Sequence, residues 1–341
     1  MNTTELVERA SLGSLLLEPD QVGAVSPWLR ESDFLYPRSQ VTYRLITAPT
    51  ATGAQAGIHD VLAAALADPA ARLNSVAGPY LHELLASPGG AGRAVVYGRL
   101  VVEASVRRRL DELAAQLCRR ASSVAQSGQA VPALAGATSQ AIDDLDSLVT
   151  RLGDTDPSGR GPLRQPMKTQ AIGGGPACQV EEYLVEALTD NPGLVAVVTT
   201  WLRPGDFQNR QHAGTYRSML ALAAASRPVD HITVTSSRRD RHVLAPVEPA
   251  HLVATRPTAT SHQTLAAARH VLAASLGRRG VAATTAIIRL VNDPTLGICQ
   301  CVQSARQQLS RYTAELARWP SLESMPDLAG HEQPASTQLS R

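Results

Sequence analysis

A repeated segment constrains the fold of this chain more than any other feature. The stretch WLRESDF at residues 28–34 returns as WLRPGDF at residues 201–207, 173 positions later. When residues 7–46 are laid over residues 180–219 without a gap, 14 of the 40 positions are identical. The only two phenylalanines of the sequence fall at the same position of this stretch. The chain is therefore predicted to fold as two copies of one structural plan.

Each copy is expected to build its core around the same large aromatic side chains, because these bury the most apolar surface. The six predicted anchors are Trp28, Phe34, Tyr43, Trp201, Phe207 and Tyr216. Aromatic residues make up only 4% of a chain in which 44% of the residues are hydrophobic. Such a composition favours helices packed through small and aliphatic side chains over a β-sandwich. The predicted fold class is all-α, and 341 residues suffice for two domains.

A long amphipathic segment follows the head of each copy. Between Arg99 and Leu117, apolar residues recur every three or four positions and form a narrow seam on one face of a helix. The seam, which is the candidate interaction surface, consists of Val102, Val106, Leu110, Leu113 and Leu117. A second apolar segment around Leu145 is expected to fold back on it through the turn at Gly128, making a helical hairpin. Six residues of the first helix recur 170 positions later, so the duplication extends through it.

These patterns divide the chain into two repeats with a connection between them. The predicted boundaries are 1–152 for the first repeat (head 1–98, hairpin 99–152), 153–177 for a flexible linker, 178–319 for the second repeat (head 178–263, hairpin 264–319) and 320–341 for a disordered tail. Because the linker keeps the two hairpins at a high effective concentration, they are expected to pair within the chain. Pairing between chains is the alternative, since the same residues would allow it.

The residues disfavour catalysis and cofactor binding. A phosphate-binding loop needs Gly-Lys-Ser/Thr after a glycine-rich turn, and the only lysine, Lys168, has no such turn before it. No ATP-hydrolysing motor, no catalytic residue and no cofactor is therefore expected. Cys299 and Cys301 are closer together than the ligands of a zinc ribbon and no second pair faces them, so no metal is expected either.

The charge and the N-terminus bear on location. A formal net charge of +2 provides no global field toward nucleic acid or an anionic membrane. Glu5 and Glu8 stand where a secretory signal would be basic and then apolar, and no run of 18 apolar residues occurs. The protein is expected in the cytoplasm, without membrane contact.

Arginine clusters are the candidate contacts to nucleic acid. These residues are Arg107, Arg108, Arg109, Arg278 and Arg279, and their guanidinium groups could hold phosphates. Asp111 and Glu112 lie close by, and no aromatic residues are interleaved for base stacking. Solvated helix faces are therefore the favoured interpretation, and a nucleic-acid-binding accessory protein is the alternative function.

Each repeat resembles the N-terminal domain of DnaB-type replicative DNA helicases. The first repeat carries the pattern Glu-x-x-x-Leu-Gly-x-Leu-Leu-Leu at residues 8–17, then Pro19, then Leu-x-x-x-Asp-Phe at residues 29–34, then a helix containing Tyr43. The second repeat departs from this pattern in its first helix, at Val185-Glu186. It keeps the histidine that the family often places after Asp-Phe, as His212, where the first repeat has Ser39, and it keeps the run Pro-Val-Asp-x-x-Thr-Val at residues 228–234.

The resemblance implies a fold and a function. Such domains consist of a small helical head and a helical hairpin, through which they dimerise in the collar of the hexameric helicase ring. In that family the domain binds primase and supports ring assembly without hydrolysing ATP. The implied function is a non-catalytic interaction module of the primosome that engages a replicative helicase, a primase or another copy of itself in DNA replication. A decayed helicase fragment without activity is a further alternative.

Overall fold

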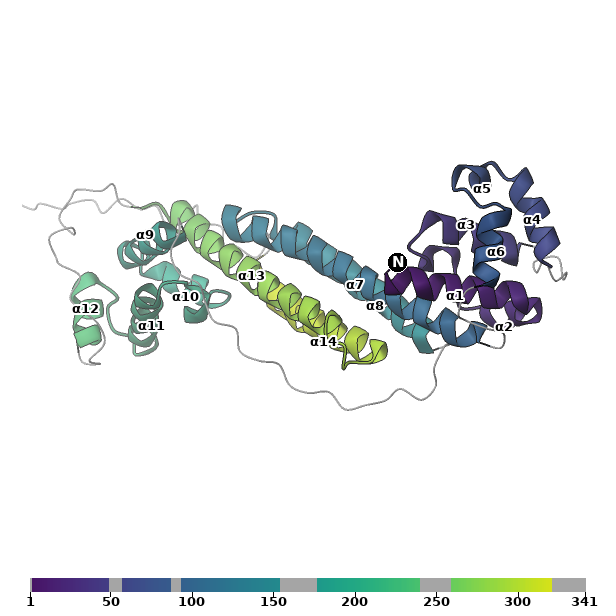
Figure 1. The fold of residues 1–341 in the computed structure, drawn as a ribbon. Helices are drawn as coiled ribbons and strands as arrows, with labels where there is room; N and C mark the ends of the chain where they lie inside the picture. Colours follow the sequence, from purple (N-terminus) through teal and green to yellow (C-terminus); the bar gives the residue numbers. More distant parts are fainter. Residues whose placement is uncertain (1, 49–56, 87–92, 154–176, 240–258, 321–341) are drawn as a thin grey trace, which may run out of the picture. The chain divides into compact units, whose positions relative to one another are not determined.

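The computed structural model describes residues 2–48, 57–86, 93–153, 177–239 and 259–320 (Figure 1). All regular elements in these ranges are helices, which confirms the all-α prediction. The predicted linker and tail lie outside the described residues, apart from Gly153, Ala177 and Pro320. The chain forms two compact units, each of which holds one head.

The first repeat begins with a head of short helices and ends with two long ones. Its helices are α1 (Thr3–Leu17), α2 (Val22–Val25), α3 (Pro37–Thr47), α4 (Ile58–Ala67), α5 (Pro69–Leu73), α6 (Gly78–Leu85), α7 (Ala94–Ser127) and α8 (Val131–Gly153), with 3₁₀ turns η1 (Pro19–Gln21) and η2 (Glu31–Asp33). Helix α1 begins after Asn2, whose side chain accepts from the backbone N–H of Glu5 at 2.9 Å. Gly128, at φ +65°, makes the turn between α7 and α8 where the sequence predicts it.

The second repeat follows the same order in its first three helices and in its hairpin, with the helix α12 described between them. Its helices are α9 (Ala177–Asp190), α10 (Gly193–Thr199), α11 (Arg210–Ala224), α12 (His231–Arg239), α13 (Ser261–Val291) and α14 (Ile298–Leu316), with the 3₁₀ turn η4 (Pro204–Asp206). Among the described residues, α13 alone is long and apolar enough to cross a membrane, and 56% of its most apolar window is buried inside the protein. That degree of burial is typical of a core helix.

The aromatic anchors occupy equivalent places in the two heads. The ring centroids of Phe34 and Tyr43 are 5.0 Å apart, and those of Phe207 and Tyr216 are 5.1 Å apart, with nearly the same tilt. Each tyrosine hydroxyl donates to the carbonyl of the leucine in the WLR motif, at 2.8 Å in the first head and 3.4 Å in the second. Burial raises the pKa of Tyr216 to about 12, so the hydroxyl keeps the proton that it donates. In each head the tyrosine thus fixes the Trp-Leu-Arg segment, at residues 28–30 or 201–203, to the third helix.

The two tryptophan anchors differ in depth. Trp201 is buried, whereas Trp28 is half-buried and lies over α7 at Gly98. A Cβ atom at Gly98 would come within 2.9 Å of the Trp28 ring, so the small residue allows the indole to rest on the helix backbone.

A buried aspartate joins the head to the hairpin in the first unit. Asp33 is 1% exposed and accepts a hydrogen bond from the Ser105 hydroxyl of α7 at 2.9 Å. It also forms an ion pair with Arg151 of α8, and Arg108 of α7 donates to its backbone carbonyl at 2.5 Å. The Arg151 guanidinium also donates to the backbone carbonyl of Trp28, at 3.2 Å. One loop is therefore held by both helices of the hairpin.

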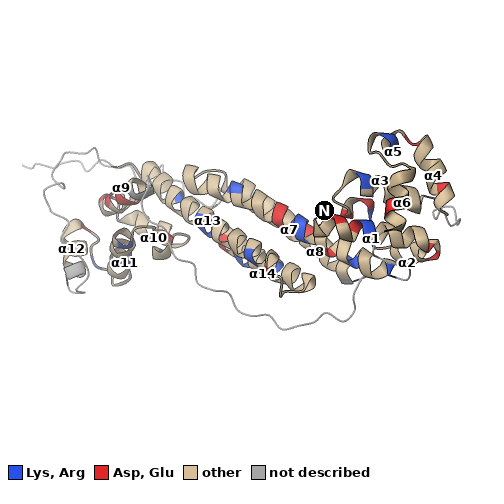
Figure 2. Cartoon of the chain, viewed as in Figure 1, with Lys and Arg blue, Asp and Glu red and all other residues tan. Residues whose placement is uncertain are grey.

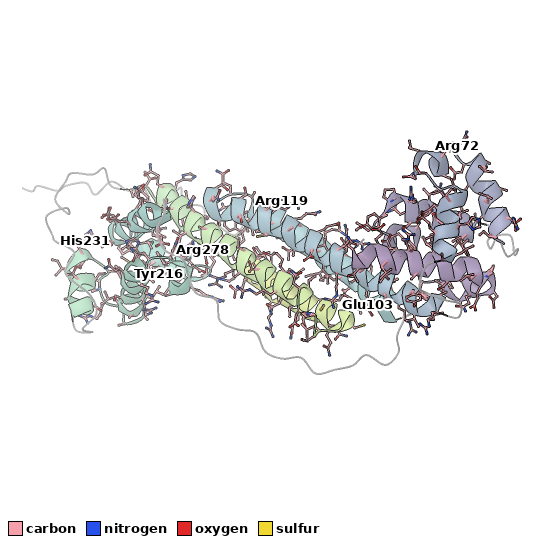
Figure 3. The ribbon with its side chains drawn as sticks, viewed as in Figure 1. Arg72, Glu103, Arg119, Tyr216, His231 and Arg278 are labelled. Atoms are coloured by element: carbon pink, nitrogen blue, oxygen red, sulfur yellow. The ribbon has the colours of Figure 1, made fainter. Side chains whose placement is uncertain are left out.

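The second unit contains the same junction with one more charge. Asp206 is fully buried, accepts from the Ser275 hydroxyl at 2.8 Å and forms an ion pair with Arg318. Arg278 donates to its backbone carbonyl at 2.7 Å, and Arg279 lies 3.1 Å from its carboxylate. Figure 3 shows Arg278 on α13, beside the second head that contains Tyr216.

We expect Asp33→Asn and Asp206→Asn each to lower the free energy of unfolding by about 3–5 kcal/mol, because removing one partner of a buried ion pair leaves the other charge uncompensated. The larger loss is expected for Asp206→Asn, since Asp206 pairs with two guanidinium groups. Urea unfolding followed by circular dichroism measures both. The exposed Asp190→Asn is the control and should change the value by less than about 0.5 kcal/mol. A loss below about 1 kcal/mol at both buried positions would contradict the assignment.

Candidate interaction surface

The predicted seam lies on a covered face of α7. Val102, Val106 and Leu110 are each 1% exposed, and Leu113 and Leu117 are also buried. Leu145 of the returning helix α8 is equally buried, at 1%. In this chain the seam side chains are therefore part of a core, and they are not displayed to solvent.

In the first unit the tip of the second hairpin contacts the first hairpin. Residues 287–306 belong to this unit, together with α7 as far as Ala114 and α8 from Asp143. Arg107 of α7 donates to the carbonyls of Val291 and Leu296, at 2.6 and 2.8 Å. These contacts pair residues of the two repeats within one chain.

The second unit contains the reciprocal arrangement. The tip of the first hairpin shares one hydrophobic cluster with α13 and the second head, and its members there are Ala121, Val124, Val131 and Leu134. A Cβ atom at Gly277 of α13 would lie 2.4 Å from the backbone nitrogen of Ala125 in α7. The two helices are thus in backbone contact at this point.

The second hairpin contains a large side chain and a small one where the first has two leucines. Ser105 and Ser275 are equivalent because both donate to the buried aspartate, and this register aligns Leu110 with Gly280. Arg151 and Arg318 are equivalent because both form the ion pair with that aspartate, and this aligns Leu145 with Tyr312. A Cβ atom at Gly280 would lie 2.5 Å from the Tyr312 hydroxyl oxygen, and this hydroxyl donates to the Leu276 carbonyl at 3.0 Å. The tyrosine ring therefore fills the space that the glycine leaves.

The five candidate nucleic-acid contacts all have partners inside the protein. Arg107, Arg108 and Arg278 are half-buried and donate to backbone carbonyls, so their interpretation as solvated helix faces is wrong. Arg109 lies 3.0 Å from Asp144, and Arg279 pairs with Asp206 and Glu315. Figure 2 shows charges of both signs interspersed along α7. Phosphate binding would have to compete with these internal acceptors.

A buried glutamate in the first helix of each head is a structural residue whose role sequence reasoning did not assign. Glu8 and Glu181 are each 1% exposed. Glu8 accepts from the backbone N–H of Leu35 at 2.5 Å, and Glu181 accepts from those of Gln208 and Asn209, at 2.6 and 3.0 Å. Each carboxylate thus fixes the segment that leads into the third helix of its head. Its recurrence at one repeat position was the available signal.

The two glutamates differ in their side-chain partners. Burial raises the pKa of Glu8 above its ordinary value, in spite of hydrogen bonds from the backbone and from Ser39. Burial also opposes ionisation of Glu181, but the hydrogen bond from His212 and those from the backbone outweigh it and lower the pKa of this carboxyl. The Nδ1 atom of His212 is 3.3 Å from the carboxylate. The second head therefore holds its glutamate more firmly in the charged form.

In the described part of the chain, no three His, Cys, Asp or Glu side chains are placed to share a metal ion. Cys301 is buried and donates to the Leu290 carbonyl at 3.4 Å, while Cys299 is half-buried.

Comparison with known proteins gives one family. The DnaB-like helicase N terminal domain matches the chain twice, over residues 2–103 and 177–272. Together the two matches cover more than half of the sequence. No curated protein and no solved structure matches the chain.

We expect His212→Ser to lower the free energy of unfolding near neutral pH by about 1–2 kcal/mol, because Glu181 loses a hydrogen bond to its charged form. Above the ordinary pKa of 4.5, the charged Glu181 stabilises the folded state, and this contribution is lost as the pH falls through its lowered pKa. The difference between the variant and the parent protein should therefore shrink below pH 4.5. Urea unfolding at a series of pH values tests this, with the exposed His262→Ser as control. A difference that stays constant with pH would contradict the pairing.

Proposed function

Because the chain belongs to the family of the DnaB-like helicase N terminal domain, we propose that it is a non-catalytic interaction module of DNA replication. It resembles the collar of a replicative helicase and engages a helicase, a primase or another copy of itself. The observation that carries the proposal is that the family matches twice and no motor domain is found. Two recognition domains without a motor suit an adaptor. Its proposed location is the cytoplasm, where the replication machinery of such helicases works.

The proposed domains are the two repeats, at residues 1–152 and 178–319. Both heads retain the aromatic pair, the buried glutamate and the buried aspartate that hold their shape. Retention of these costly buried charges in both copies supports a working pair of domains over a decayed fragment.

Nucleic-acid binding is the weaker candidate function. The arginines that would carry it already donate to carbonyls and carboxylates of the protein. The first head is the better candidate for a protein-binding surface. Leu66 of α4 and Leu73 of α5 have 64% and 86% of their surface exposed, and Figure 3 shows Arg72, which precedes Leu73 in the sequence, on α5. We propose that these two leucines take part in the contact with a protein partner.

We expect the purified chain to form a complex with the replicative helicase or the primase of its host and to hydrolyse no ATP. Size-exclusion chromatography with light scattering measures the complex, and release of phosphate from Mg-ATP measures hydrolysis. Binding of single-stranded DNA that weakens steeply as salt is raised, without binding to either protein, would instead favour the nucleic-acid function. ATP hydrolysis that co-purifies with the chain would overturn the non-catalytic assignment.

The double change Leu66→Ser and Leu73→Ser should weaken that complex at least tenfold, because each buried leucine contributes about 1.5–3 kcal/mol to an interface. Ile232→Ser is the matched control, since Ile232 is an equally exposed apolar residue of the second head, at 81%. Circular dichroism should show that both variants keep the parent helix content. Equal binding by the two variants would place the contact elsewhere.

A further inference from the structure

The contacts between the two hairpins differ in kind between the two units. Ser105 and Ser275 each donate a hydrogen bond to the buried aspartate of their own repeat. Arg108 and Arg278 each donate to the backbone carbonyl of that aspartate. This register places Gly277 at the position of Arg107. At this position the first hairpin therefore carries the long cationic side chain of Arg107, whereas the second hairpin carries Gly277, which has no side chain.

In the first unit, Arg107 fits the tip of the second hairpin. Val291 is the last residue of α13, so its carbonyl belongs to the helix end that lacks an intrahelical partner. The guanidinium donates to this carbonyl and to that of Leu296 in the following loop. A cation is also favoured at this end by the helix dipole, and Arg107 helps to keep the pKa of the nearby Asp293 low, after the hydrogen bonds from Thr295.

In the second unit, Gly277 fits the tip of the first hairpin. Helix α7 continues to Ser127, whereas the residue of α7 that is equivalent to the end of α13 is Ala121. At this position α7 is therefore still a helix, and it offers no helix end to a cation. A Cβ atom at Gly277 would lie 2.4 Å from the Ala125 nitrogen and 2.7 Å from the Ala121 oxygen. Any side chain there would force the helices apart.

We propose that position 107/277 makes the pairing of the hairpins heterotypic, so that each hairpin accepts the hairpin of the other repeat and rejects a copy of itself. If two copies of the first hairpin paired, Arg107 of one copy would lie against the backbone of Ala121 and Ala125 of the other. The guanidinium would find neither room nor a free carbonyl acceptor there. A guanidinium buried in this way is costly. If two copies of the second hairpin paired, Gly277 of one copy would lie against the loop after Val291 of the other. The carbonyls of Val291 and Leu296 would then lose the donor that Arg107 provides. This inference does not depend on the proposed function.

Cleavage of the chain after it has folded tests the proposal. A protease site is introduced between residues 154 and 176 of the full chain, a tag is added at the C-terminus, and the folded protein is cut and captured by the tag. We expect one first half to be retained for each second half. Mixing differently labelled proteins before the cut shows whether the partner comes from the same chain or from a second copy. Like halves that co-purify, or halves that separate at once, would overturn the proposal.

Two substitutions locate the selectivity. Arg107→Ala should release the first half at least about tenfold faster than the parent, because two hydrogen bonds from a charged group are lost. Arg109→Ala is the matched control, since it removes the same side chain from the same helix but from a residue that pairs with Asp144 within the first hairpin. Gly277→Arg, which gives the second hairpin the residue of the first, should abolish retention. Equal release rates for the Arg107→Ala and Arg109→Ala proteins would contradict the assignment, even if the Gly277→Arg protein failed to fold.

Discussion

The buried carboxylate of Asp33, and of Asp206 in the second repeat, is the interaction on which each unit depends. Such a charge is stable in the interior only when it is paired and hydrogen-bonded. Here the partners come from three places: the loop itself, the outgoing helix of the hairpin and the returning helix. A hydrophobic contact would allow the head to slide on the hairpin, whereas this set of donors accepts one orientation. The aspartate therefore sets the direction in which each hairpin leaves its head.

The arginines show how one residue type serves two purposes in this architecture. Arg108 and Arg278 connect a helix to the head of their own repeat. Arg107, one position earlier on α7, faces away from that head and contacts the other repeat. Because successive residues of a helix point about 100° apart, adjacent arginines separate the two tasks by geometry alone. Reading the cluster as one basic patch conceals this division.

The sequence predicted the duplication and the helical class, because these follow from local periodicity and from residues that recur. It did not predict the environment of the arginines. Asp111 and Glu112 are their neighbours along the chain, but the groups that Arg107 and Arg108 bind are Val291 and Asp33, which are distant in sequence. The role of Gly277 was likewise hidden, since a glycine within a helix gives no sign of what approaches it. Long-range partners of this kind require the three-dimensional fold.

The exchange of Leu110 and Leu145 for Gly280 and Tyr312 has a consequence for how such a protein can evolve. In a symmetric homodimer every substitution at the interface appears twice, so a bulky side chain must tolerate its own copy across the axis. Once both partners are encoded in one chain, each position can change alone, and a loss of volume on one side can be matched by a gain nearby. With both copies in one chain, the two hairpins can be complementary instead of identical.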